Sequence, residues 1–203
     1  MKNHIHIIQH LSNDAALNQV LMSIDLPDTK PSFDVYTDLV SSIISQQIST
    51  KAAQAVYRRF ADLFPEQQPT PTLLATMPIE TLRNAGLSQQ KAAYVKNTAQ
   101  FFIENSLLKD DWQQLSDNEI IGLLTRIKGV GVWTSQMILM FTLDRPDILP
   151  LDDLGIQHGF RKLYGLQEEG KLLKQRMVAI AEPWQPYRTY ACRAIWKWKD
   201  NII

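Results

Sequence analysis

The sequence predicts an all-α fold, and three observations support that prediction. Apolar residues recur at helical spacing along nearly the whole chain, and no pair of alternating strands joined by a tight turn is evident. Residues that favour the starts and ends of helices, chiefly Ser, Asp, Pro and Gly, stand between these stretches. The 203 residues suffice for a substantial core. We therefore expect about ten helices with short connections.

The helices of the first half begin at capping residues or after helix breakers. We expect them from Ser12 to about Ile24, from Phe33 to Ile48, from Ser49 to Phe64 and from Pro78 to Gly86. Prolines interrupt the segment PEQQPTP at 65–71, which is therefore predicted to be a loop.

The second half shows clearer start signals. Ser88 is suited to cap a helix that reaches about Asn105, and Ser116 with Glu119 has the spacing of a capping box. Further helices are expected from Val132 to about Leu143, from Asp152 and Asp153 to Tyr164, over a segment that ends near Ala181, and from Pro186 to Lys199.

Composition excludes several classes of protein. No run of about 18 apolar residues occurs, so no membrane span is expected, and the N-terminus lacks a signal-peptide pattern. The single cysteine, Cys192, cannot form an intramolecular disulfide or a four-cysteine metal site, and we expect a cytoplasmic protein. Lys and Arg total 21, as do Asp and Glu, so the formal net charge is zero. This balance argues mildly against a nucleic-acid partner but leaves one open, since phosphate contacts need only local charge and main-chain donors.

The most informative segment is residues 123–141, where two predicted helices are joined by Gly129-Val130-Gly131. Such a turn is often no more than an ordinary connection between helices. The glycines would also let the backbone approach another molecule closely, and the N–H groups at the start of the second helix would face outward. With Pro150 and a pair of carboxylates downstream, this context favours a site for an anion such as a DNA phosphate.

These residues resemble the motif of the helix-hairpin-helix (HhH-GPD) DNA glycosylases. The matching positions are Leu124, Ile127, Gly129, Val130, Gly131 and Thr134, with Ser135 where the family has alanine. Residues 43–53, 82–95 and 179–196 are similar to the 3-methyladenine DNA glycosylase II branch, in its compact form. The resemblance implies two helical lobes with a DNA-binding cleft between them. Lobe A would comprise about residues 1–35 and 150–203, and lobe B about 36–149 with the hairpin at 124–135.

The resemblance assigns catalysis to Asp153, although an aspartate at a helix start is more commonly a cap. Its carboxylate would stabilise the positive charge that develops on the sugar and orient the attacking water. Asp152 would then be the cap or a supporting group. Val132 and Trp133 occupy the region where lyase-active relatives carry a nucleophilic lysine, which implies a monofunctional enzyme. Trp133 and Trp196 would line the pocket for a cationic, alkylated base, although either tryptophan could simply be structural.

The resemblance also implies contacts with DNA. Residues of the hairpin and of three other short segments would make them, namely Lys128, Gly129, Val130, Gly131, Thr134, Gln46, Gln47, Ile48, Ser88 and Lys91. Gln47 or Ile48 would be the wedge that fills the gap left by the extruded base. Hairpin carbonyls near Thr125, Ile127 and Val130 would suit a structural monovalent cation. No cofactor is required and no metal site is expected, since His4, His6, His10 and His158 show no ligand spacing.

The expected function is therefore hydrolysis of the N-glycosidic bond of alkylated purines during base excision repair, by a monomer acting on double-stranded DNA in the bacterial cytosol. Two alternatives from other classes are a non-enzymatic module that recognises damaged DNA and a helical scaffold for proteins. A third is a glycosylase for a lesion that is not an alkylated base. The sequence does not rank the alkylated bases, and residues near Phe33 and Tyr36 are further candidates for the wall of the base pocket.

Overall fold

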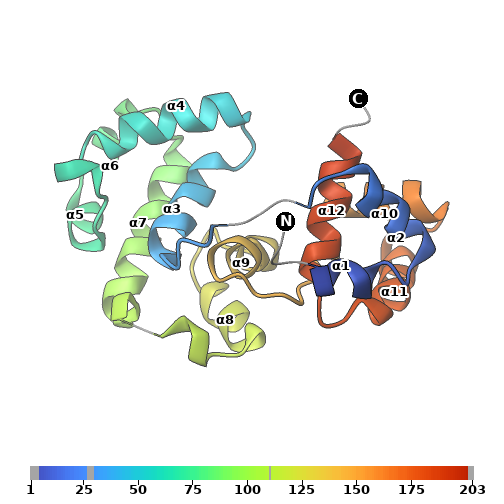
Figure 1. Cartoon of the computed structure of the whole chain (residues 1–203). Coiled ribbons are helices and arrows are strands. Elements are labelled where there is room, and N and C mark those ends of the chain that lie inside the picture. Colours follow the sequence, from blue (N-terminus) through green and yellow to red (C-terminus); the bar gives the residue numbers. More distant parts are fainter. Residues whose placement is uncertain (1–4, 27–29, 110, 201–203) are drawn as a thin grey trace. The chain divides into compact units, whose positions relative to one another are not determined.

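The computed structural model describes residues 5–26, 30–109 and 111–200, and in these ranges it contains helices and no strands (Figure 1). The predicted all-α fold is confirmed. The α-helices are α1 (Ile5–Leu11), α2 (Ala15–Ser23), α3 (Val35–Ser45), α4 (Thr50–Ala61), α5 (Pro71–Thr76), α6 (Ile79–Asn84), α7 (Gln89–Glu104), α8 (Asp117–Leu124), α9 (Val132–Met137), α10 (Leu154–Tyr164), α11 (Gly170–Ala181) and α12 (Arg188–Asp200). Short helical turns at Pro65–Gln67, Leu107–Lys109, Trp112–Gln114 and Glu182–Trp184 connect them, and α9 continues as a π-helix at Ile138–Thr142.

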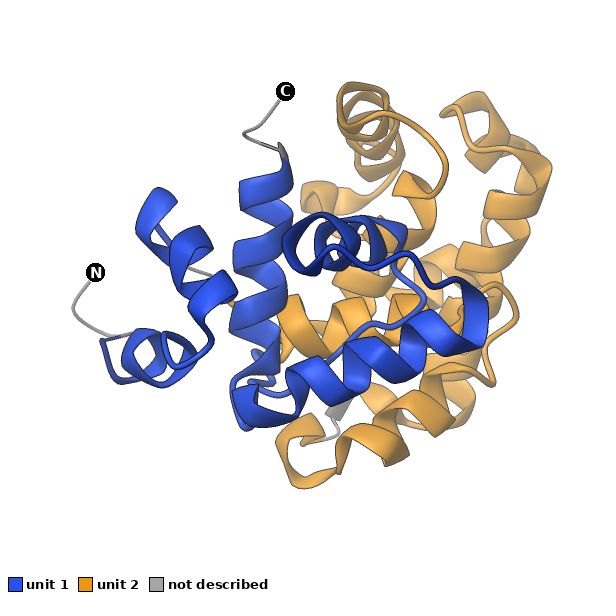
Figure 2. Cartoon of the chain, turned by 90° about the vertical axis from the view of Figure 1, so that its right-hand side faces the viewer, with its two compact units in different colours: residues 1–30, 144–203 blue, residues 31–143 orange. Residues whose placement is uncertain are grey.

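The chain divides into two compact units, which Figure 2 distinguishes by colour. Unit 1 comprises residues 1–30 and 144–203, and unit 2 comprises residues 31–143. The chain passes from one unit to the other after residues 30 and 143, whereas the expected lobes change after residues 35 and 149. Phe33 belongs to unit 2 because its N–H donates to the Thr142 carbonyl at 3.2 Å. The segment from residue 144 belongs to unit 1 because Arg188 of α12 binds the Asp147 carboxylate with two hydrogen bonds of 2.6 and 2.8 Å.

Unit 1 is organised around the side chain of Asp14. Its Oδ1 caps α2 by accepting the N–H groups of Ala16 and Leu17. Its Oδ2 accepts the hydroxyl of Tyr164 at 2.8 Å and the indole N–H of Trp184 at 3.1 Å. One carboxylate thus joins α2 to two aromatic side chains from the other end of the sequence. Burial and then the bond to Asp14 raise the pKa of Tyr164, so its hydroxyl stays protonated and donating.

Helices α10 and α12 lie close together in unit 1 (Figure 1). Gly159 of α10 is buried, and a Cβ at this position would overlap the Cγ2 atom of Ile195 in α12. The absence of a side chain therefore sets how closely the two helices approach.

Unit 2 packs α7 against α3 and α5, and several of its helices start as predicted. Ser49 and Ser88 cap α4 and α7 through their hydroxyls. The capping box is present, with Ser116 accepting from the Glu119 N–H and Glu119 accepting from the Ser116 N–H. These predictions are confirmed because each depends on residues a few positions apart.

Other boundaries were predicted wrongly. Ser12 does not start a helix, because the chain turns at residues 12–14 and Asp14 takes the capping role. Phe33 has a φ of 56° and cannot belong to α3, which Asp34 caps instead. The predicted loop at 65–71 contains a helical turn, and Pro71 begins α5 because proline suits the first helical position.

None of the helices in the described ranges has the length and apolarity needed to cross a membrane. His4 lies outside the described residues. Within them, no group of three or more His, Cys, Asp or Glu side chains is arranged to hold a metal ion.

We predict that Gly159→Ala lowers the free energy of unfolding by about 1–3 kcal/mol, because the added methyl group must displace Ile195. Guanidinium unfolding followed by circular dichroism measures this. Gly122→Ala in α8 is the control, since a Cβ there meets no atom within 4 Å. It should raise stability by up to about 1 kcal/mol, because alanine favours the helix more than glycine does. Equal effects of the two changes would contradict the close approach of α10 and α12.

Candidate functional site

Asp153 is held at the start of α10 by two hydrogen bonds to one oxygen. Its Oδ1 accepts the main-chain N–H of Ile156 at 2.7 Å, which makes Asp153 the N-cap of the helix. The same Oδ1 accepts the indole N–H of Trp196 in α12 at 2.9 Å. Asp153 is half-buried rather than fully enclosed. The two donors restrict the carboxylate to one orientation, which is the arrangement that electrostatic stabilisation of a developing positive charge needs.

Asp152 does not have the capping role considered for it. Its exposed side chain forms an ion pair with Lys174 of α11. Nearby Cys192 is fully buried, and burial followed by the negative charge of Asp153 raises the pKa of its thiol. A protonated, buried thiol is a poor nucleophile. Of these three side chains, Asp153 is therefore the one suited to chemistry.

Gly155 makes room for the pair formed by Asp153 and Trp196. A Cβ at Gly155 would lie 3.0 Å from the Asp153 Oδ1, 3.0 Å from the Trp196 Nε1 and 3.1 Å from the Trp196 Cδ1. These distances are shorter than ordinary van der Waals contacts, so a side chain here would push the carboxylate and the indole apart. Sequence reasoning missed this residue, although the spacing of Gly155 and Gly159 on one face of α10 was an available signal.

The two glycines of the hairpin have different roles. Gly129 has a φ of 103°, which side chains rarely tolerate, and a Cβ there would overlap the ring of Tyr94 from α7. Gly131 has an extended backbone, and a Cβ there would meet nothing within 4 Å. Gly129 is therefore needed for the turn itself, whereas the exposed Gly131 leaves open space on the solvent side of the hairpin.

The hairpin presents main-chain donors at this open side. Within the described residues, the N–H groups of Gly129 and Gly131 donate no hydrogen bond. The Val130 N–H is used in the turn, donating to the Ile127 carbonyl at 3.0 Å. Free amides at the start of α9 attract an anion without any basic side chain.

The side chains predicted to contact DNA at the hairpin divide into two groups. Lys128 is exposed and available. Val130 and Thr134 are buried, with Thr134 only 4% exposed, so their side chains belong to the core of unit 2. Neither side chain is therefore suited to a phosphate contact, and the Val130 N–H is already used in the turn.

Trp133 lies beside the glutamine segment that follows α3. A cavity of about 450 Å³ is lined by Ser42, Ser45, Gln46, Gln47 and Trp133, all from unit 2. Trp133 is 40% exposed, as expected for a pocket wall rather than for a core residue. Gln47 has a φ of 58°, a strained conformation of the kind that clusters at functional sites. Gln47 and Ile48 are both exposed, so the structure leaves both as wedge candidates.

Ser88 and Lys91 were predicted to form a second phosphate contact, but both side chains have internal roles. The Ser88 hydroxyl caps α7, and the Lys91 Nζ donates to the Ile44 carbonyl at the end of α3, at 2.7 Å. Partial burial lowers the pKa of Lys91. Lys91 therefore tethers α7 to the turn that leads into Gln46 and Gln47.

Comparison with known proteins identifies the family of the chain. Residues 40–186 match the family model of the HhH-GPD superfamily of base excision DNA repair proteins. The chain belongs to this superfamily. A relative from Schizosaccharomyces pombe, DNA-3-methyladenine glycosylase 1, is 37% identical over 164 residues, which cover 80% of this chain and 71% of the relative.

Solved structures of HhH-GPD proteins are similar over almost the whole chain. The structure of the Schizosaccharomyces pombe 3-methyladenine DNA glycosylase Mag1 in complex with abasic DNA has a TM-score of 0.80 and 33% identity, and the match covers 95% of each chain. The structure of a DNA-3-methyladenine glycosidase from Bacillus halodurans has a TM-score of 0.81 and 33% identity, with 98% of this chain and 91% of that chain covered. The family predicted from the hairpin motif is confirmed.

Within this family fold, the predicted site residues fall into two groups. Asp153 and Trp196 are brought together in unit 1, whereas Trp133, the hairpin and the glutamine segment lie in unit 2. The residues that sequence reasoning missed are supporting ones, namely Gly155 beneath the carboxylate and Tyr94 beneath the hairpin.

We predict that Gly155→Ala breaks the hydrogen bond between Trp196 and Asp153, because the new methyl group occupies the contact space of both side chains. The indole N–H resonance of Trp196 in a ¹H–¹⁵N NMR spectrum reports this bond and should move upfield. Trp196→Phe identifies the resonance by its disappearance, and Gly122→Ala is the control that leaves it in place. An unshifted resonance in Gly155→Ala would contradict the role given to Gly155.

For the hairpin, we predict that Gly129→Ala lowers the free energy of unfolding by about 1–3 kcal/mol, because of its positive φ and the overlap with Tyr94. Gly131→Ala should change stability by no more than about 0.5 kcal/mol, since its side chain would enter open space. Urea unfolding of both variants measures the difference. Removing the ring in the double variant Gly129→Ala with Tyr94→Ala should not restore full stability, since the backbone strain persists.

Proposed function

We propose that this protein is a DNA glycosylase that hydrolyses the N-glycosidic bond of alkylated purines, of the 3-methyladenine type, in base excision repair. The observation that carries the proposal is the Asp153 carboxylate, oriented through Oδ1 by Ile156 and Trp196. The names of relatives that are 33–37% identical to the chain support the same substrate class.

In the proposed reaction, the bond between C1′ of the sugar and the base nitrogen breaks, and its electron pair leaves with the base. Positive charge then grows on the sugar, where the negative Asp153 would stabilise it. A water molecule would add its oxygen to C1′ and lose a proton. A purine alkylated on a ring nitrogen, as in 3-methyladenine, carries a positive charge while it is bound to the sugar and leaves readily, so this mechanism needs no separate acid to protonate it.

The two tryptophans would supply selectivity for such a base. Trp133 is exposed beside its cavity, and Trp196 is half-buried while bonded to Asp153. Electron-rich indole rings attract cationic rings by stacking and cation–π interaction. Val132 and Trp133 provide no amine at the start of α9, which supports a hydrolase without lyase activity.

Double-stranded DNA containing alkylated bases would bind through the amides of Gly129 and Gly131 and through Lys128, while Gln47 or Ile48 would fill the space of the extruded base. The carbonyls of Thr125, Ile127 and Val130 would hold a monovalent cation, since a carbonyl that already accepts one bond, as that of Ile127 does, keeps a second lone pair. Such a cation would stabilise the hairpin and take no part in the chemistry. We propose a monomer that acts in the cytoplasm on nucleoid DNA.

We predict that Asp153→Asn reduces base release from methylated DNA by about 100-fold or more, because the charge that stabilises the sugar is lost. Asparagine retains an oxygen for the Ile156 N–H, so α10 keeps its cap and the variant should fold. Chromatography of the released bases measures the activity and also ranks 3-methyladenine against other lesions. DNA affinity should be retained, and Asp152→Asn is the control that should keep activity. Undiminished release by Asp153→Asn would refute the mechanism, and absence of release by the wild type would favour a non-enzymatic module that recognises damaged DNA.

A further inference from the structure

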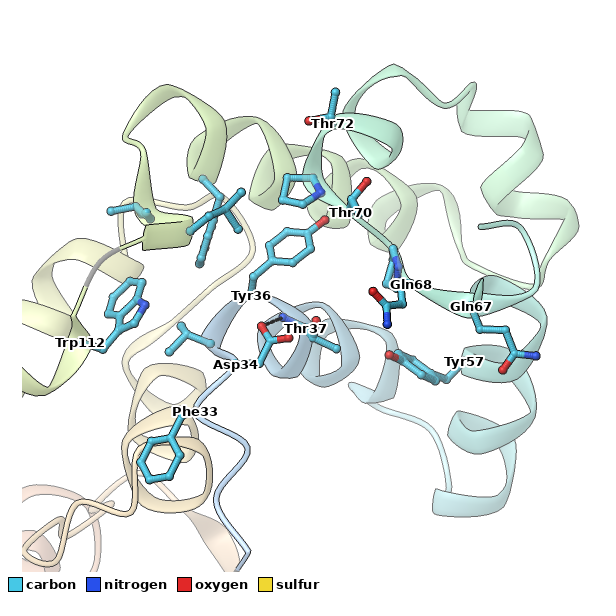
Figure 3. A pocket seen from close by; sticks show the side chains of 16 residues that line it. Phe33, Asp34, Tyr36, Thr37, Tyr57, Gln67, Gln68, Thr70, Thr72 and Trp112 are labelled. Atoms are coloured by element: carbon cyan, nitrogen blue, oxygen red, sulfur yellow. Dashed lines mark hydrogen bonds between the residues drawn. The ribbon is translucent and has the colours of Figure 1, made fainter. Parts of the chain in front are cut away.

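A second cavity, of about 650 Å³, lies in unit 2 around the first turn of α3 and shares no lining residue with the cavity beside Trp133. It is formed by that turn, by α4, by the segment 67–72 and by the end of α7 with the turns that follow it. Figure 3 shows Tyr36 reaching from α3 towards the segment that carries Thr70, and Tyr57 pointing from α4 towards Gln68. A volume of this size is typical of sites for small molecules.

The buried hydroxyl of Tyr36 is the feature that indicates a ligand in this cavity. Tyr36 is only 5% exposed, and its hydroxyl has no hydrogen-bond partner within the described residues. A buried hydroxyl without a partner costs free energy, so native structures rarely keep one. A molecule in the cavity that offers a polar hydrogen or an acceptor atom would remove this cost.

The charge of the lining indicates which kind of molecule fits. Asp34 is the acidic residue of the lining, and none of the lining residues is Lys, Arg or His. Burial and the nearby carboxylates raise the pKa of both Tyr36 and Tyr57. Both phenols therefore stay neutral, and the cavity disfavours an anion and favours a cation.

The aromatic residues indicate the shape of the molecule. Phe33 is 55% exposed at the rim, held at a φ of 56°, and Tyr57 is half-buried. Within the wall, Tyr36 packs edge-on against Phe102 with ring centroids 5.2 Å apart. Aromatic faces beside a carboxylate are the combination that binds flat organic cations.

We propose that this cavity binds a small, flat organic cation that carries an amidinium or guanidinium group. Its N–H groups would donate to the Asp34 carboxylate and to the oxygen of Tyr36, and its apolar part would contact Phe33 and Tyr57. Asp34 already caps α3 through Oδ1 by accepting the Thr37 N–H at 3.0 Å, so its orientation is fixed before the ligand arrives.

Three probes with the same ring test the proposal on the full chain by ¹H–¹⁵N NMR titration. Benzamidine, a cation, should give saturable shifts in residues 33–37 and 67–72. Benzamide, its neutral counterpart, should bind at least about tenfold more weakly, and benzoate should not bind, because only the cation gains from the carboxylate and the aromatic faces. Equal binding of benzamidine and benzamide, or the absence of shifts with benzamidine, would overturn the proposal.

Two variants locate the binding groups. Asp34→Asn keeps an oxygen for the helix cap but should weaken benzamidine binding by about tenfold, because the charge is removed. Tyr36→Phe should weaken binding severalfold without lowering the melting temperature, because the hydroxyl has no partner to lose in the free protein. Asp25→Asn, which removes the same charge from an exposed position in unit 1, is the control and should bind like the wild type. Unchanged affinity in both cavity variants would place benzamidine elsewhere and contradict the assignment.

Discussion

The Oδ1 atom of Asp153 accepts two hydrogen bonds, and the geometry of the candidate site depends on both. As the N-cap it fixes where α10 begins, and as the acceptor of the Trp196 indole it fixes α10 against α12. Both bonds need the helices to lie close together, and glycine at positions 155 and 159 permits this. The position of the carboxylate therefore follows from the packing of unit 1 rather than from the conformation of a flexible loop.

The chain has no net charge, yet it belongs to a family of DNA repair proteins, and the proposed role of the hairpin of unit 2 accounts for this. Its donors are main-chain amides at Gly129 and Gly131, whose partial charges do not enter a count of ionised residues. Tyr94 packs against the turn at Gly129, where a Cβ would overlap its ring. In the proposed function, local geometry takes the place of the basic excess that is common in DNA-binding domains.

The features that were predictable from sequence are those set by nearby residues. The caps at Ser49, Ser88 and Ser116 and the glycine turn each involve residues within about one helical turn, so local patterns reveal them. At Asp14 the cap is equally local, with Ala16 and Leu17 as donors, and Ser12 was preferred to it wrongly. What local pattern could not show is the use of the second Asp14 oxygen by Tyr164 and Trp184, more than a hundred positions away. The tether formed by Lys91 could not be predicted from local pattern either, since its acceptor, the Ile44 carbonyl, lies 47 positions earlier in the chain.

Contacts between distant parts of the chain also matter for the adjacent residues Asp152 and Asp153, and there they concern the candidate site. Two adjacent aspartates at a helix start are similar in local pattern, and the bond of Asp153 to the Ile156 N–H is the one local feature that distinguishes them in the structure. Neighbours from other helices add to this distinction. Lys174 of α11 engages Asp152, while Trp196 of α12 engages Asp153. The capping role of Asp153 and its proposed catalytic role are compatible. A carboxylate already held by the main chain loses little freedom when it faces a substrate, so the cap itself contributes to the preorganisation that the proposed chemistry requires.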